Sequence, residues 1–203
     1  MMNTASQTSP VPEPQLAPPG AGLPPLERFI GGLLFALRRA TSSRSAIAAR
    51  FQAERERIRQ LLAPLSAEQA VQRVLIPRVR GLEDSSRYWS AWMTLDHLRI
   101  VHEGMTRVIR ALTSGVTPPG QSSTAAVKPR TDVDAGVVAA WEASCDALAA
   151  AVESVPESAL KTAVRYAHPW FGPLDAFAWY CLAAGHHRIH RVQLERICAA
   201  LAG

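Results

Sequence analysis

Several features that define common protein classes are missing from this chain. It has only three cysteines, Cys145, Cys181 and Cys198, and this odd number with no close pair argues against a disulfide framework and for a reducing compartment. The longest strongly apolar run, Phe29 to Leu37, covers nine residues, whereas a helix that spans a bilayer needs ~20. The N-terminus lacks the basic and apolar regions of a secretory signal. We therefore expect a soluble, cytoplasmic protein in which Cys145 and Cys181 are small core residues.

Blocks of like charge are also absent. The net charge is +5, and 20 of the 22 basic residues are arginines. A basic balance can indicate a nucleic acid or an anionic membrane as partner. Here, however, the arginines are dispersed and alternate with acids, as in Glu54-Arg55-Glu56-Arg57, which is typical of solvated helix faces. We therefore expect neither a nucleic-acid partner nor a membrane partner.

The alternation typical of β-strands is lacking as well, and the prolines are concentrated at one end. Seven of the 15 prolines fall in residues 1–25, which predicts a disordered, polyproline-like tail. Residues 26–43 predict an accessory N-terminal helix. Its apolar face needs a cover, so we expect it to pack on the body of the protein or on a second subunit, and we expect a homodimer. Residues 44–203 then form the main domain.

Helical periodicity within this domain predicts four long helices. Their expected ranges are 44–63, 90–113, 132–154 and 173–202, with Ser90 as an N-cap and Pro173 as a first helical residue. Ser66 and Gln69 have the spacing of a capping box, which predicts a short helix over 67–72. The fold class is therefore all-α: an antiparallel four-helix bundle with a long crossover between its first and second helices, plus the extra N-terminal helix.

Two of the six histidines have the spacing of metal ligands. His186 and His190 lie one turn apart on one helix face, and two imidazoles placed in this way can bind one metal ion. Their face is an apolar stripe, where polar groups are costly unless they are paired. A metal site needs at least three protein ligands, so the third must come from another helix. His97 and His102 both border the apolar stripe of the helix over 90–113, and helix geometry does not choose between them.

The other polar residues near this pair leave alternatives open. Gln193 follows on the same stripe, so a buried histidine–glutamine hydrogen-bond network is the competing interpretation. His187 is turned about 100° from His186 around the helix, and we expect it at the bundle edge or on the surface. His168 precedes the helix and could reach over the site from a loop. No Glu-x-x-His pattern is present, so di-iron carboxylate chemistry is not supported.

Two motifs resemble the DinB-like superfamily. Residues 168–197 contain His-Pro-x-Phe-Gly-x-Leu, then aromatic residues, and then His-x-x-x-His-x-x-Gln. Trp89-Ser90 is followed, eight residues after the tryptophan, by His97-Leu98. Many relatives have arginine directly before the last histidine, where this chain has Ile189. The resemblance implies a four-helix bundle that holds a divalent metal ion through His97, His186 and His190, and so it selects His97 over His102.

The resemblance also implies a class of chemistry. Zinc, nickel, iron and manganese all suit such a three-histidine site. The implied activity is that of a metal-dependent thiol S-transferase or hydrolase, which acts on a small-molecule substrate and uses a low-molecular-weight thiol in the first case. His102 and His168 are the candidate general bases. The alternatives are a non-catalytic, stress-related protein that binds a metal or a small molecule, and a metal-free helical interaction module.

Overall fold

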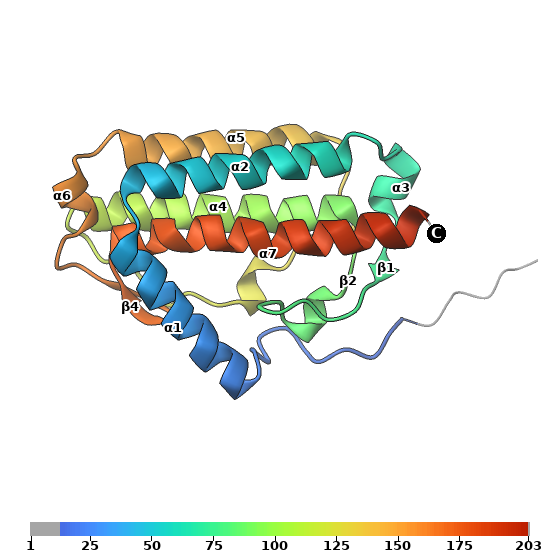
Figure 1. The fold of residues 1–203 in the computed structure, drawn as a ribbon, viewed down its shortest axis with the longest axis horizontal. Coiled ribbons are helices and arrows are strands. Elements are labelled where there is room, and N and C mark those ends of the chain that lie inside the picture. Colours follow the sequence, from blue (N-terminus) through green and yellow to red (C-terminus); the bar gives the residue numbers. More distant parts are fainter. Residues whose placement is uncertain (1–12, 203) are drawn as a thin grey trace, which may run out of the picture.

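Four long helices form a bundle (Figure 1). The structure is a computed structural model, and it describes residues 13–202. The bundle helices are α2 (Arg44–Leu62), α4 (Ala91–Thr113), α5 (Gly136–Glu153) and α7 (Ala176–Ala202). A further helix, α1 (Pro25–Thr41), runs obliquely across the start of α7. The predicted all-α four-helix bundle with an extra N-terminal helix is therefore confirmed.

Short elements fill the connections between these helices. They are α3 (Ala67–Val71), α6 (Glu157–Leu160), and the 3₁₀ turns η1 (Asp84–Ser86) and η2 (Ala125–Val127). Strand β1 (Val74–Leu75) pairs antiparallel with β2 (Tyr88–Trp89), and β3 (Tyr166–His168) pairs antiparallel with β4 (Gly172–Leu174). Val74 lies opposite Trp89, and His168 lies opposite Gly172. Both strand pairs are too short to alter the fold class.

The directions of the helices differ from the expected antiparallel arrangement in two neighbouring pairs, α4 with α5 and α2 with α7. For α2 and α7, the contacts of Glu54 with Arg191 and of Leu61 with Cys198 show this. The predicted long connection between the first two bundle helices is present and carries α3, β1 and β2. A second long connection, over 114–135, returns along the bundle, so α4 and α5 run in the same direction (Figure 1). Side chains and carbonyls joined along the pair show this: Asp96 bonds Arg130, His102 bonds Ser144, and Leu112 bonds Thr162. Sequence periodicity finds helices but carries no information on their directions.

Several helices begin where a nearby side chain caps them. The Ser90 hydroxyl accepts a hydrogen bond from the Met93 N–H at 3.1 Å, and Ser66 and Gln69 form the predicted capping box. The prediction that Pro173 opens the last helix is wrong, because Pro173 lies in β4. The helix instead begins at Ala176, where the Asp175 carboxylate accepts from the Ala178 N–H at 2.8 Å. A carboxylate at the N-cap accepts a hydrogen bond from a free N–H group of the first helical turn, which a proline in that turn cannot do.

The core is one apolar cluster that all four bundle helices share. Trp141, Phe51 and Ile58 are among its largest fully buried side chains. Arginines of α2 and α7 form ion pairs between helices: Arg55 with Glu142 and Asp146, and Arg191 with Glu54 at 2.5 Å. These arginines therefore serve the contacts between helices. Arg55 and Glu54 are buried, so these pairs lie within the helix contacts and not on the surface.

The N-terminal helix keeps most of its apolar side chains exposed in the single chain. Phe29 is 71% exposed and Leu33 is 63% exposed, and α1 contains no buried residue. It is attached through Phe35, whose ring stacks on Phe171 at 4.9 Å, and through the Arg39–Asp175 ion pair at 2.6 Å. The exposed face agrees with the expectation that something covers it. The homodimer stays a prediction.

The segment before α1 contacts the connection that precedes α4. The Ala17 N–H donates to Asp84 at 2.8 Å, and the Gly20 and Gly22 N–H groups donate to Glu83. The predicted disordered tail over 1–25 lies partly, over 1–12, outside the described residues. Among the helices of residues 13–202, none combines the length and the apolar character that a membrane crossing requires.

Candidate metal centre

Three histidines from two helices converge on one point. The Nε2 atom of His186 lies 3.1 Å from the Nε2 atom of His97 and 3.1 Å from the Nε2 atom of His190. His97 is on α4, and the other two are one turn apart on α7. The geometry allows all three nitrogens to bind one ion, since their ligand atoms lie within 4.8 Å of one another. The structure thus brings together the three residues predicted as metal ligands.

Hydrogen bonds at the far side of two rings determine which nitrogen faces the centre as an acceptor. His97 Nδ1 lies 2.6 Å from the Val127 carbonyl oxygen, which can only accept, so Nδ1 carries the proton. His190 Nδ1 lies 2.6 Å from Gln193 Oε1. The Gln193 amide is oriented because its Nε2 group donates to the Ser86 carbonyl at 2.7 Å. His97 and His190 therefore present bare Nε2 lone pairs, as metal ligands do.

The third ring is arranged differently. His186 is half-buried, whereas His97 and His190 are buried. Its Nδ1 atom is inaccessible to solvent and has no hydrogen-bond partner among the described residues. Without a cation, the only proton available to the centre is one on His186 Nε2, shared between two acceptors. A metal ion at the centre would satisfy all three Nε2 atoms at once, so the donor set fits such an ion.

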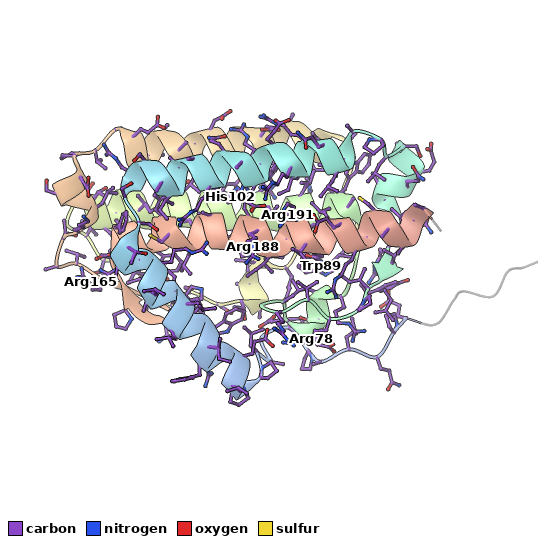
Figure 2. All side chains as sticks on the ribbon, in the orientation of Figure 1. Arg78, Trp89, His102, Arg165, Arg188 and Arg191 are labelled. Carbon is purple, nitrogen blue, oxygen red and sulfur yellow. The ribbon has the colours of Figure 1, made fainter. Side chains whose placement is uncertain are left out.

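Trp89 forms one wall of the centre and reaches it from the short β1–β2 pair. Its ring lies 5.1 Å from the His97 ring and 6.1 Å from the His190 ring, nearly parallel to the latter. The next residue, Ser90, caps α4, so the strand end and the helix start jointly determine where the tryptophan and His97 lie. In the view of Figure 2, Trp89 lies on one side of α7 and His102 on the other. The apolar wall lowers the local polarity around the three imidazoles.

A polar cluster fastens the crossover segment that supplies the Val127 carbonyl. Lys128 donates to Glu83 at 2.8 Å and to the Ser85 and Ser86 hydroxyls. On the other side, the buried Asp96 carboxylate accepts from the Arg130 N–H at 3.0 Å. Because Asp96 precedes His97 directly, both ends of this segment are held beside the ring that Val127 orients. The crossover therefore also helps to orient the His97 ring.

Burial keeps the three imidazoles neutral near pH 7. It lowers the pKa of His97 from 6.5 to about 4. Burial also lowers the pKa values of His186 and His190 well below the usual histidine range, and the nearby histidines add to the effect at His186. A neutral imidazole is the form that binds a metal ion. The centre is therefore ready to take a cation without first losing protons.

The other predicted residues lie elsewhere. The structure places His102 beside Cys145 and His187 in the bundle interior, and not among the three converging histidines. His168 stacks on Phe171 at 4.9 Å and accepts from the Trp170 N–H. The prediction that His187 lies at the edge or on the surface is wrong, since it is 0% exposed. Both α2 and α4 pack on α7, so a position turned away from His186 still faces the interior.

The sequence does not reveal the main-chain carbonyl groups that help to orient the histidines and Gln193. The Val127 and Ser86 carbonyls are main-chain atoms, so no residue type marks them. Asp96 and Lys128 could have been noticed as charged residues next to a ligand and inside a loop, but neither has a diagnostic spacing. Gln193 lies on the histidine stripe as the sequence predicts, and its side-chain oxygen accepts a hydrogen bond from His190 at 2.6 Å.

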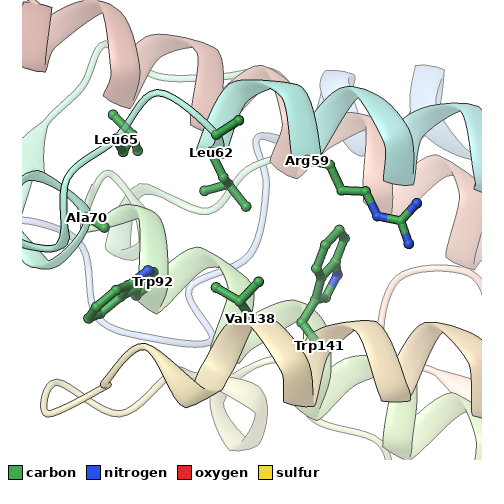
Figure 3. Close-up of a pocket in the computed structure, with 8 residues that line it drawn as sticks. Arg59, Leu62, Leu65, Ala70, Trp92, Val138 and Trp141 are labelled. Carbon is green, nitrogen blue, oxygen red and sulfur yellow. The ribbon is translucent and has the colours of Figure 1, made fainter.

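Two hollows lie near the bundle end that carries α3 and β2. An apolar one of ≈ 320 Å³ is lined by Arg59, Leu62, Ala63, Leu65, Ala70, Trp92, Val138 and Trp141, most of which Figure 3 labels. It shares no residue with the three converging histidines. A second hollow of ≈ 250 Å³ lies between the 13–19 segment and a wall that includes Arg73, Ser85 and Trp89. Trp89 thus separates this second hollow from the candidate centre.

Replacing Gln193 by leucine should weaken metal binding without removing a ligand. The change keeps the volume but leaves the His190 N–H without its acceptor, and loss of such outer contacts typically costs about 10- to 100-fold in affinity. Isothermal titration of the metal-free protein with zinc measures the change. Gln60→Leu, on the exposed face of α2, is the matched control. Equal affinities for Gln193→Leu and the wild type would contradict a positioning role for Gln193.

Comparison with known proteins agrees with the fold. A model of the DinB superfamily matches residues 39–194. The crystal structure of TT2238, described as a four-helix bundle protein, is similar with a TM-score of 0.53 at 19% sequence identity. The similarity covers 73% of this chain and 95% of that one, and at this identity it concerns the fold alone. No curated protein matches the chain.

Proposed function

This chain belongs to the DinB superfamily, and on that premise we propose that it is a metal-dependent enzyme that acts through His97, His186 and His190. The reaction class is transfer of a low-molecular-weight thiol to an electrophile, or hydrolysis of a small molecule. One observation carries the proposal: three Nε2 atoms converge, and two of them are oriented by Nδ1 hydrogen bonds to Val127 and Gln193.

The protein residues have separate tasks in this proposal. A divalent ion at the centre would supply Lewis acidity, which lowers the pKa of a thiol or water bound to it. The three neutral imidazoles add no charge of their own, so they leave the charge of the ion uncompensated. Trp89 excludes water from one side of the rings. His186 is the most exposed of the three rings.

A hollow next to the centre supports the proposal of a small-molecule substrate. The hollow of ≈ 250 Å³ includes Arg73, Ser85, Tyr88 and Trp89 in its walls. Trp89 also contacts His97 and His190. A substrate held there would be one side chain away from the three imidazoles, and a tryptophan rotation would connect the two spaces. We therefore propose a small-molecule substrate, and neither a nucleic acid nor a membrane takes part.

A second candidate function is binding without turnover. Within residues 13–202, the ring nitrogens of the three histidines have hydrogen-bond contacts only with one another, with the Val127 carbonyl and with Gln193. No carboxylate or further histidine contacts them there in the way a general base would. His102 and His168, the sequence candidates for that role, have other partners. This arrangement favours a metal- or small-molecule-binding protein if no reaction is found.

Activity assays on the metal-loaded protein distinguish the two functions. The wild type is offered thiols with electrophiles, and esters or amides, and is compared with His186→Ala. We expect turnover in one of these classes and a loss of about a hundredfold or more in the variant, because Lewis-acid stabilisation amounts to several kcal/mol and 1.36 kcal/mol is tenfold. Arg188→Ala, an exposed change on the same helix, is the control. Bound metal with no turnover in any class would favour the binding function instead.

A further inference from the structure

A second group of potential metal ligands lies inside the bundle. It consists of His102 on α4, Cys145 on α5 and His187 on α7. The Cys145 Sγ atom lies 3.7 Å from His102 Nδ1 and 3.9 Å from His187 Nε2. One ligand atom from each residue lies within 4.8 Å of the others. Three helices thus contribute one donor each to a single point.

These three side chains are completely enclosed. His102, Cys145 and His187 are each 0% exposed. The Phe51 ring stacks on His187 at 4.2 Å and meets His102 edge-on at 5.4 Å. The Trp141 ring lies 6.0 Å from His187 and also borders the apolar hollow of Figure 3. The surroundings are those of a dry core, where unpaired polar groups cost free energy.

Hydrogen bonds within the protein do not satisfy this group. The Ser144 hydroxyl donates to the Trp141 carbonyl at 2.6 Å, so it can only accept from His102 Nδ1 at 3.1 Å. His102 Nε2 then has a bare lone pair and no partner among the described residues, and His187 Nδ1 has no well-formed hydrogen bond there, only the nearby Phe51 backbone. The remaining contacts are the long ones to sulfur. Unsatisfied buried polar groups destabilise the folded state, so an apolar residue at either position would be more stable.

The donor spacing matches metal coordination. With zinc–nitrogen bonds of about 2.1 Å and a zinc–sulfur bond of about 2.3 Å, tetrahedral angles separate the ligand atoms by roughly 3.5 Å. The observed 3.7 Å and 3.9 Å exceed this by a few tenths of an ångström. Two imidazoles with one thiolate are a ligand set typical of zinc, and of other soft or borderline ions.

We propose that His102, Cys145 and His187 form a second, enclosed metal site that holds a zinc-class ion and ties α4, α5 and α7 together. On binding, a sulfur–metal bond replaces the Cys145 S–H bond, and that proton leaves to solvent. The His102 proton, which Nδ1 donates to Ser144 without a metal, moves to Nε2, so that Nδ1 becomes the ligand atom beside the sulfur. No atom changes oxidation state. Without a cation, burial raises the pKa of the Cys145 thiol to about 12, so the thiol stays protonated and a poor nucleophile. The site is independent of the proposed enzymatic function, because it shares no ligand with the three-histidine centre.

Cobalt tests this proposal, because a cobalt–thiolate charge-transfer band requires sulfur ligation and the three-histidine centre has no sulfur. The full chain is expressed in minimal medium with cobalt, so that the ion is present while the bundle folds. We expect the band and about two cobalt ions per chain in the wild type. His97→Ala should keep the band and lose about one ion, and Cys145→Ser should lose the band. Cys181→Ser, the other buried cysteine, should keep it.

X-ray absorption at the cobalt edge of the wild type needs no variant and covers the case in which Cys145→Ser does not fold. A sulfur neighbour in the first coordination shell is the expected result. Cobalt bound with nitrogen and oxygen neighbours only would overturn the second site, as would a band that survives Cys145→Ser. If His97→Ala keeps the band but the wild type is inactive in every assay, the proposed function fails while this inference stands.

Discussion

Replacing His97 by alanine is expected to remove the thermal stabilisation that zinc or nickel gives to the metal-free protein through the three-histidine centre. A ligand at 100 times its dissociation constant adds about 2.7 kcal/mol to the stability of the folded state. For a chain of this size, that corresponds to a rise in Tm of roughly 5–10 °C. The variant retains two histidines of α7 but loses the ligand from α4, so the ion no longer links the two helices. Differential scanning calorimetry with and without metal measures the effect.

His168→Ala is the matched control for this change. It removes a histidine that lies outside both groups of potential ligands, so the shift in Tm on adding metal should equal that of the wild type. Elemental analysis of the same samples gives the stoichiometry independently of stability. A full metal-induced shift in His97→Ala would contradict the assignment of this ligand, and no shift in the wild type would contradict the centre as a whole.

The second large effect is a loss of stability of the metal-free protein in acid. Burial lowers the pKa of His97 and of His168 from 6.5 to about 4. Between these two values the unfolded chain binds more protons than the folded chain, so the free energy of unfolding falls as the pH decreases from 6.5 towards 4. Each such histidine contributes a slope of up to about 1.4 kcal/mol per pH unit. The stability is fully present above pH 6.5.

Urea unfolding at a series of pH values measures this slope. In the His168→Asn variant the slope should decrease by up to about 1.4 kcal/mol per pH unit, since asparagine does not titrate. The asparagine side-chain oxygen can still accept from the Trp170 N–H, which His168 Nδ1 accepts in the wild type at 3.1 Å. An unfolding free energy that stays constant from pH 6.5 to 4 would show that the histidines are not held neutral by burial.

Local chemistry explains why much of the fold was predictable. The apolar periodicity located the four bundle helices, and Ser90 and Ser66 marked two helix starts through hydrogen bonds that involve only neighbours in sequence. The start of α7 was not predictable, because Pro173 has the correct backbone angle for a helix but pairs with Ala167 in a short hairpin. That choice depends on a contact outside the helix.

The candidate metal centre was predictable to a similar extent. The i, i+4 spacing placed His186 and His190 on one face of a helix, and the family motif selected His97. Helix geometry alone left His97 and His102 equivalent, since both border the same apolar stripe. Tertiary structure distinguishes them: His97 faces Trp89 and the crossover, whereas His102 faces Phe51 and α5.

The sequence by itself determined the histidine pair of the last helix: two imidazoles one turn apart, in a helix of a four-helix bundle, with Gln193 on the same apolar stripe. Only the tertiary structure decided that α4 and α5 run in the same direction. That arrangement brings Val127 to His97, and it brings Cys145 to His102 and His187. The physical reason is that spacing within a helix depends on local backbone geometry, whereas contacts between helices depend on how the connections return the chain.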